Sequence, residues 1–174
     1  DVYKRQVRAV PRLGTVEMRV CDGMATIEEI AAVTALTQCL VHDLSSRLEC
    51  GADAPAILPP WYAAENKWRA ARYGLEARVI LDAEGNDAPV AEHLGEELER
   101  LAPVARELGC EAELDHVHAM MAESGAARQR RIEREAASVP PAEGQAPDDA
   151  VAPLRAVVLD AAARTRTSLR STTG

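Results

Sequence analysis

A glutamate and an arginine two positions apart, in a segment with the alternation of a strand, are the residues best placed to do chemistry. Residues 13–21 read Leu-Gly-Thr-Val-Glu-Met-Arg-Val-Cys, so Glu17 and Arg19 share one face about 7 Å apart. A carboxylate there can bind a hard cation such as Mg²⁺, and a guanidinium can bind phosphate or carboxylate. A diagonal ion pair on the wet face of a sheet explains the same pattern, and the residues alone favour it.

The elements around this segment must hold it in place. Its other side carries Val16, Met18 and Val20, which we expect to face a core. Thr26 and Glu29 form a capping box that begins a helix over about residues 27–50. The helix is expected to bury an apolar stripe made of Ile30, Val33, Leu36, Thr37, Leu40, Val41, Leu44 and Leu48.

A second helix is predicted over residues 61–75, because Pro60 suits a first helical turn. The spacing predicts that one side is buried, with the residues Trp61, Ala64, Trp68, Ala71 and Leu75. The other side aligns Glu65, Arg69 and Arg72, next to Asn66 and Tyr73. Read in isolation, that side is typical of a solvated charged face.

Shorter elements follow. A strand at 78–81 and a turn at 82–87 predict a small hairpin that closes near residues 89–90. Helices are expected at 91–108, interrupted or begun afresh at Pro103, then at 111–123 and 126–136. Residues 138–149 have the composition of a disordered linker. A last helix at 151–164 should dock through Leu154, Val157, Val158 and Ala161, with a frayed tail beyond it.

Composition narrows the class of protein. With 174 residues and 47% apolar content, one domain with a sizeable core is expected. The net charge of −8 argues against nucleic acid or an anionic membrane as the main partner, but not against ATP. The basic run at 128–134 is interpreted as a solvated helix face. No apolar run approaches a membrane span and no signal peptide is seen, which predicts a cytoplasmic protein.

Cysteines and histidines give no sign of a metal or redox motif. Cys21, Cys39, Cys50 and Cys110 lack C-x-x-C spacing, so reduced thiols are expected. The histidines lack partners at ligand spacing, and no role is assigned to His42, His93, His116 or His118.

Three segments together resemble the carboxylate-amine ligase, or type 2 glutamate–cysteine ligase, family. They are Pro-Arg-Leu-Gly-Thr-Val-Glu-Met-Arg-Val-Cys-Asp at 11–22, Glu-Asn-Lys-Trp-Arg-Ala-Ala-Arg-Tyr-Gly-Leu at 65–75 and Gly-Ala-Ala-Arg-Gln-Arg at 125–130. The resemblance implies an α+β protein, the mostly helical C-terminal part of a glutamine-synthetase-like fold. One or two antiparallel strands would belong to a larger sheet.

The resemblance also implies an activity. ATP would phosphorylate the side-chain carboxylate of glutamate, and the amine of cysteine or another small molecule would attack the acyl phosphate. Glu17 would be a Mg²⁺ ligand, and Arg19 a catalytic residue that binds ATP phosphate. Four further residues would bind substrate or support its site: Arg8, Asn66, Arg69 and Arg72. The family's Pro-His step is replaced by Ala9-Val10, so no histidine is assigned there.

Members of that family carry a long N-terminal portion with further strands and metal ligands. We therefore expect this chain to be a truncated piece that is inactive alone, with a homo-oligomer left open. Residues 1–6 are expected to be an unrelated end, 7–137 the C-terminal part of the catalytic domain, 138–150 a linker and 151–174 a terminal helix with its tail. The alternative is a non-catalytic helical module that pairs with a partner chain through its edge strand.

Overall fold

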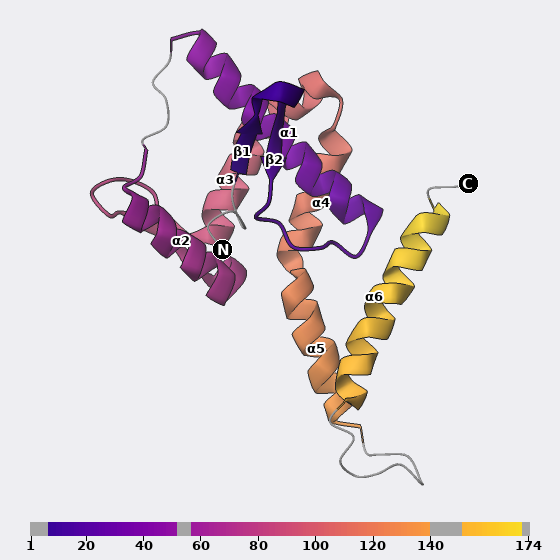
Figure 1. Cartoon of the computed structure of the whole chain (residues 1–174). Coiled ribbons are helices and arrows are strands. Elements are labelled where there is room, and N and C mark those ends of the chain that lie inside the picture. The colour runs from indigo at the N-terminus through magenta and orange to yellow at the C-terminus, as the bar shows by residue number, and fades with distance from the viewer. Residues whose placement is uncertain (1–6, 52–56, 140–150, 172–174) are drawn as a thin grey trace.

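The computed structural model describes residues 7–51, 57–139 and 151–171, which form a mostly helical α+β structure with two small antiparallel sheets (Figure 1). None of the described helices is both long and apolar enough to cross a membrane. The elements in chain order are β1 (Val7–Val10), a 3-10 turn (Pro11–Leu13), β2 (Thr15–Met18), α1 (Ile27–Glu49), α2 (Pro60–Tyr73), a 3-10 turn (Gly74–Glu76), β3 (Arg78–Ile80), β4 (Asp87–Pro89), α3 (Val90–Leu108), α4 (Glu111–Ala122), α5 (Gly125–Ala137) and α6 (Ala152–Ser171).

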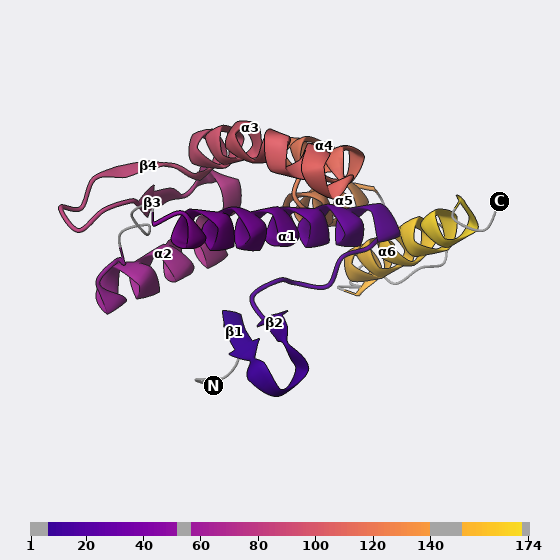
Figure 2. The same ribbon diagram turned by 90° about the horizontal axis from the view of Figure 1, so that it is seen from above.

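Helix α1 lies at the centre, with α3 and α4 on one side and the β1–β2 hairpin on the other (Figure 2). The core forms on the side of α3 and α4, where Leu101 and Cys39 are fully buried. Small side chains on α1 let the helices approach closely, which compensates for the absence of Phe. The core side chains are Ala32, Cys39, Leu98, Leu101, Ala105, Leu114 and Val117.

The start of α1 follows the predicted capping box. The Thr26 hydroxyl accepts a hydrogen bond from the Glu29 amide, and the Glu29 carboxylate accepts one from the Thr26 amide. The predicted buried stripe was wrong in part, because Ile30, Val41 and Leu48 are exposed. The small residues of α1 face the core instead, so several of the larger ones are left on the opposite side.

The prediction for the buried side of α2 was wrong. Trp61 and Trp68 are 67% and 56% exposed, and Ala64 and Ala71 are exposed as well. Part of the polar side packs inward instead, where Asn66 hydrogen-bonds the backbone of Ile80 in β3. The predicted hairpin itself is confirmed, with Ile80 paired to Asp87 across β3 and β4.

Helix α3 passes through Pro103 without a break, which corrects the expected interruption. Pro103 lies on the exposed side of the helix, where water can hydrogen-bond the carbonyl that loses its amide donor. Leu98, Leu101 and Ala105 are buried on the other side and hold the helix against its neighbours.

Helix α6 is longer than predicted and extends through the expected frayed tail to Ser171. The buried Ser168 hydroxyl accepts a hydrogen bond from the Ile27 amide at 2.9 Å, which fixes this end of α6 to the start of α1. The docking side chains were predicted only in part, since Leu154 and Val158 are exposed. Most of the predicted linker, residues 140–150, lies outside the described residues.

The predicted basic helix face belongs to α5. Arg128 forms hydrogen bonds to both carboxylate oxygens of Asp160 on α6, at 2.9 and 2.8 Å. Arg131 binds Glu123 and Glu135. Two positive charges of this run, those of Arg128 and Arg131, are thus paired with carboxylates of the same chain.

Candidate functional site

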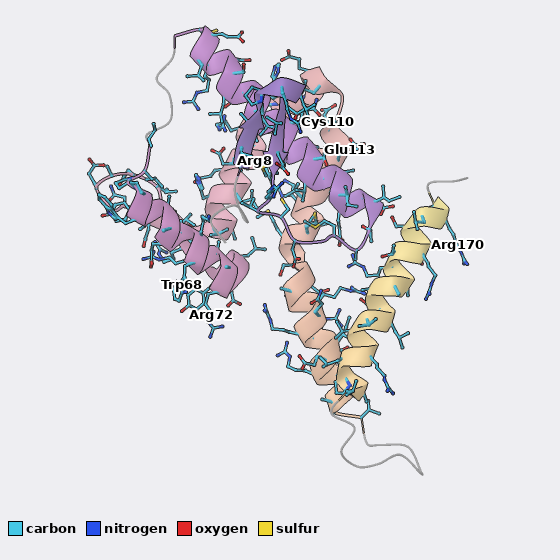
Figure 3. The ribbon with its side chains drawn as sticks, viewed as in Figure 1. Arg8, Trp68, Arg72, Cys110, Glu113 and Arg170 are labelled. Atoms are coloured by element: carbon cyan, nitrogen blue, oxygen red, sulfur yellow. The ribbon has the colours of Figure 1, made fainter. Side chains whose placement is uncertain are left out.

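The β1–β2 hairpin brings the charged side chains Arg8, Glu17 and Arg19 into contact. The antiparallel register pairs Arg8 with Glu17, and Arg19 directly follows β2. Nε of Arg8 donates to Oε2 of Glu17 at 2.6 Å, and Nε of Arg19 donates to Oε1 at 2.6 Å. One carboxylate is thereby bound from two sides by guanidinium groups, an arrangement called here the Arg8–Glu17–Arg19 cluster. Figure 3 shows Arg8 on its strand.

The cluster confirms that Glu17 and Arg19 share a face, and adds a strand that sequence analysis missed. The four residues of β1 are too few to show a clear period. The sequence signal that could have found β1 is the glycine at position 14, a residue type typical of turns. In the structure its φ is 62°, and it ends the turn that precedes β2. With that turn in place, pairing β1 to β2 brings Arg8 opposite Glu17.

The two guanidinium groups hold the pKa of Glu17 below its usual range, with the hydrogen bond from Arg19 the largest cause and that from Arg8 the next. The carboxylate is therefore ionised at neutral pH, and the cluster of two cations and one anion carries a net positive charge. The side chains of Arg8, Glu17 and Arg19 are 43%, 34% and 40% exposed. A positive, accessible cluster suits an anion such as phosphate.

Behind the cluster, the apolar side of the hairpin faces α1 across a groove of about 970 Å³. Val16 and Met18 line one wall, and Ile30, Val33 and Val41 line the other. The apolar residues of β2 therefore point towards α1. They reach an open groove and not the closed core that the alternation predicts, because Val16 remains 46% exposed.

Asn66, on the inward side of α2, binds the backbone of strand β3. Its Nδ2 donates to the carbonyl oxygen of Ile80 at 2.8 Å, and its Oδ1 accepts from the Ile80 amide at 2.8 Å. The side-chain amide thus takes the place of a neighbouring strand. No spacing in the sequence indicates this contact.

Arg69 connects α2 to the same hairpin. Its Nε donates to Oε1 of Glu65 at 2.8 Å, and its Nη1 lies 3.7 Å from Oδ2 of Asp87. Arg72, by contrast, is exposed, and its guanidinium lies 5.7 Å from the centre of the Tyr73 ring. Figure 3 shows Arg72 beside Trp68 on the outer side of α2.

The predicted site residues therefore fall into two groups, one on the β1–β2 hairpin and one on α2. Within the described parts of the chain, no hydrogen bond or ion pair joins these groups. The structure brings Arg8, Glu17 and Arg19 together, and separately Asn66 and Arg69. Their roles towards substrate or metal stay predictions.

A metal ion would find only part of its ligand set here. Glu17 offers the oxygen ligands that Mg²⁺ prefers. However, no group of 3 or more His, Cys, Asp or Glu side chains in residues 7–51, 57–139 and 151–171 could hold a metal ion. The donor chemistry therefore fits one protein ligand of a magnesium site.

The fold and the cluster define a mostly helical α+β protein whose small sheet carries a positively charged cluster on one side. The family model for glutamate-cysteine ligase family 2 (GCS2) matches residues 3–154, and the chain belongs to this family. This confirms the family recognised from the three segments.

Curated relatives extend the match. A Micrococcus luteus protein named "Putative glutamate--cysteine ligase 2" is 70% identical over 168 residues, which are 97% of this chain and 42% of the relative. A Mycolicibacterium paratuberculosis protein of the same name is 51% identical over 78% of this chain and 36% of its own length. An Arthrobacter sp. protein with the suffix 2-1 is 56% identical over 74% of this chain and 34% of its length. The chain thus spans about two fifths of these relatives or less.

Proposed function

We propose that this chain forms part of the catalytic domain of an ATP-dependent ligase of the glutamate–cysteine ligase type. The reaction joins the side-chain carboxylate of glutamate to the amine of cysteine or another small molecule through an acyl phosphate. Family membership and the names of the relatives support the class of reaction. The observation that carries the assignment to residues is the Arg8–Glu17–Arg19 cluster.

The chemistry requires two anions to meet, because ATP must transfer a phosphoryl group to a carboxylate. Such transfer depends mainly on positioning and on neutralising charge, and it needs no protein nucleophile. Arg19 would bind the phosphate oxygens of ATP, and Arg8 would bind the substrate. Glu17 would hold the guanidinium groups in place and supply a ligand for Mg²⁺, which neutralises phosphate charge when it is bound.

The hydrogen bonds of the cluster leave donors for that task. Within the described residues, Arg8 and Arg19 each bind Glu17 through Nε alone. A guanidinium has five N–H donors, so the Nη groups can bind phosphate or carboxylate oxygens while Nε stays on Glu17. The carboxylate likewise has lone pairs beyond the ones that accept from Nε, which a cation can use.

The residues of α2 would act in two ways. Asn66 and Arg69 position the β3–β4 hairpin, since both contact its backbone. Arg72 is exposed and can bind a substrate carboxylate directly. We assign the first two to support of the substrate site and Arg72 to its lining.

The rest of the site would come from protein outside this chain. In the described residues the sheet that carries the cluster has only the two strands β1 and β2. Two-stranded sheets are marginal alone, and their open edges accept further strands. We propose that a longer protein adds strands and metal-binding carboxylates here, so that this chain alone is inactive.

The test uses the longest open reading frame that contains this chain, and measures ADP release with glutamate and a panel of amines. Glu17→Gln and Arg19→Lys should each lower amine-dependent turnover by about 100-fold or more. The first removes the negative charge that holds the guanidinium groups and binds Mg²⁺, and the second removes the planar guanidinium that binds phosphate. Glu113→Gln and Arg106→Lys, at exposed helix positions outside the three family segments, should keep near-parental turnover. Parental rates in both cluster variants would reject the assignment.

A second function rests on the same open edges. A non-catalytic module could pair β1 or β2 with a partner chain by strand addition. Size-exclusion chromatography and ATP titration of the 174-residue chain separate the two functions. A well-folded chain that ignores ATP and forms a heteromer supports the module. Aggregation that the remaining part of the longer protein relieves supports the ligase.

A further inference from the structure

Two free cysteines, distant in sequence, meet beside the core. Sγ of Cys39, in the middle of α1, lies 3.7 Å from Sγ of Cys110, which precedes α4. Cys39 is 0% exposed and belongs to the core cluster, and Cys110 packs against that cluster. This contact joins the central helix to the connection between α3 and α4.

We propose that Cys39 and Cys110 are a covalent modification site, a dithiol pair that closes to an intramolecular disulfide when the protein meets a peroxide. The proposal is independent of the ligase function. It depends on the contact between the two sulfur atoms and on their different exposure.

The geometry needs little change to form the bond. A disulfide has an S–S length of about 2.05 Å. Starting from 3.7 Å, each sulfur would move by less than about 1 Å, which a small rotation about the Cα–Cβ bond provides.

Exposure sets the order of events. Cys110 is partly exposed, so a small oxidant reaches it first, whereas Cys39 is enclosed. Burial, together with the hydrogen bond to Cys110, raises the pKa of Cys39 to about 11, so Cys39 remains a thiol at neutral pH. Cys39 therefore acts as the resolving group and not as the thiol that meets the oxidant.

The two steps balance. Hydrogen peroxide oxidises the Cys110 thiol to a sulfenic acid: the O–O bond breaks, one oxygen forms the S–O bond and the other leaves as water. The Cys39 sulfur then attacks the Cys110 sulfur, the S–OH bond breaks, and the departing hydroxide takes the Cys39 proton as a second water. Two thiols and one peroxide give one disulfide and two waters.

The bond would stabilise the fold. It would connect residues 71 positions apart, and cross-links across long segments restrict the unfolded chain strongly. Both ends lie beside the core, so the bond would hold α1 against α3 and α4. For a chain of this size the midpoint of thermal unfolding should rise by about 5–10 °C.

The experiment uses the 174-residue chain with Cys21→Ser and Cys50→Ser, because those two cysteines are exposed. The chain is treated with a small excess of hydrogen peroxide, once folded and once in urea. Intact mass and free thiols are then measured, and linked peptides are sought after digestion. Adding Cys110→Ser to the same background is the matched control.

The proposal expects a mass loss of 2 Da from the monomer, a Cys39–Cys110 peptide, and a melting temperature that falls again on reduction. Disulfide formation should be at least about tenfold faster in the folded chain than in urea, because folding brings the sulfurs together. Equal rates, Cys110 oxidised to sulfinic acid without a cross-link, or cross-links only between molecules would each overturn the proposal.

Discussion

Arg8 and Glu17 lie directly opposite each other in the β1–β2 hairpin, and Nε of Arg8 donates to Oε2 of Glu17 at 2.6 Å. Arg19 binds the other oxygen of the same carboxylate. A short hairpin thus presents a positive cluster on one side while its apolar residues face α1 on the other. The register of the hairpin decides this arrangement, because a slip by one residue would reverse both faces.

The first prediction concerns the pKa of Glu17. Replacing Arg19 by Ala should raise that pKa towards the ordinary range, because the largest cause of its depression is removed. Arg8→Ala should raise it less, and Arg12→Ala, in the connecting turn, should leave it unchanged. Carboxyl-carbon NMR over a pH titration measures each value. Identical titrations of Glu17 in all three variants would contradict the cluster.

The same shift has a consequence for stability. The pKa of Glu17 is lower in the folded chain than in the unfolded one, so its pairing stabilises the hairpin above the unfolded pKa. That contribution is lost as the pH falls through the folded pKa. The amide protection factors of β1 and β2, which correct exchange for its intrinsic pH dependence, should therefore fall in acid more in the parent than in Glu17→Gln.

A second prediction concerns Asn66. Asn66→Ala removes both hydrogen bonds to Ile80, whose buried backbone groups then lack partners, at a cost of about 1–3 kcal/mol in the free energy of unfolding. Lys67→Ala, one position along on the exposed side, should change it by less than about 0.5 kcal/mol. Urea unfolding measures both variants, and amide exchange at Ile80 locates the effect. Equal stability of the two variants would refute this role.

Local signals explain which parts of the fold could be predicted from the sequence. The Thr26–Glu29 capping box is decided within one helical turn, and it predicts the start of α1 correctly. The hairpin between Arg78 and Pro89 follows from a short β-rich run and a Gly-Asn turn. The alternation of side chains along a strand is also local, and it predicts that Glu17 and Arg19 share a face.

Contacts between distant segments explain what could not be predicted. Asn66 turns inward because the backbone of Ile80, 14 positions later, needs partners, and no periodicity in α2 records that need. Arg8 joins the cluster through pairing of a four-residue strand. The Cys39–Cys110 contact spans 71 positions and is invisible to motif spacing.

The third prediction tests the core. Leu101, on α3, is 0% exposed and belongs to the core cluster that α1, α3 and α4 form. Leu101→Ala should therefore lower the free energy of unfolding by about 2–5 kcal/mol through lost burial and a residual cavity. Leu159→Ala on α6 removes the same atoms from a side chain that is 65% exposed, and should cost less than about 0.5 kcal/mol. Urea unfolding followed by circular dichroism compares the pair, and equal losses would contradict the assigned core.

The last prediction concerns the attachment of α6 to the start of α1. The Ser168 hydroxyl accepts from the Ile27 amide and donates to Oε2 of Glu28, and this donation is the main cause of the lowered pKa of Glu28. Ser168→Ala should raise that pKa, accelerate amide exchange at Ile27 and cost about 1 kcal/mol in the free energy of unfolding. Thr167→Ala, at the exposed neighbouring position, should change none of the three. Unchanged exchange at Ile27 in Ser168→Ala would show that α6 is fixed by other contacts.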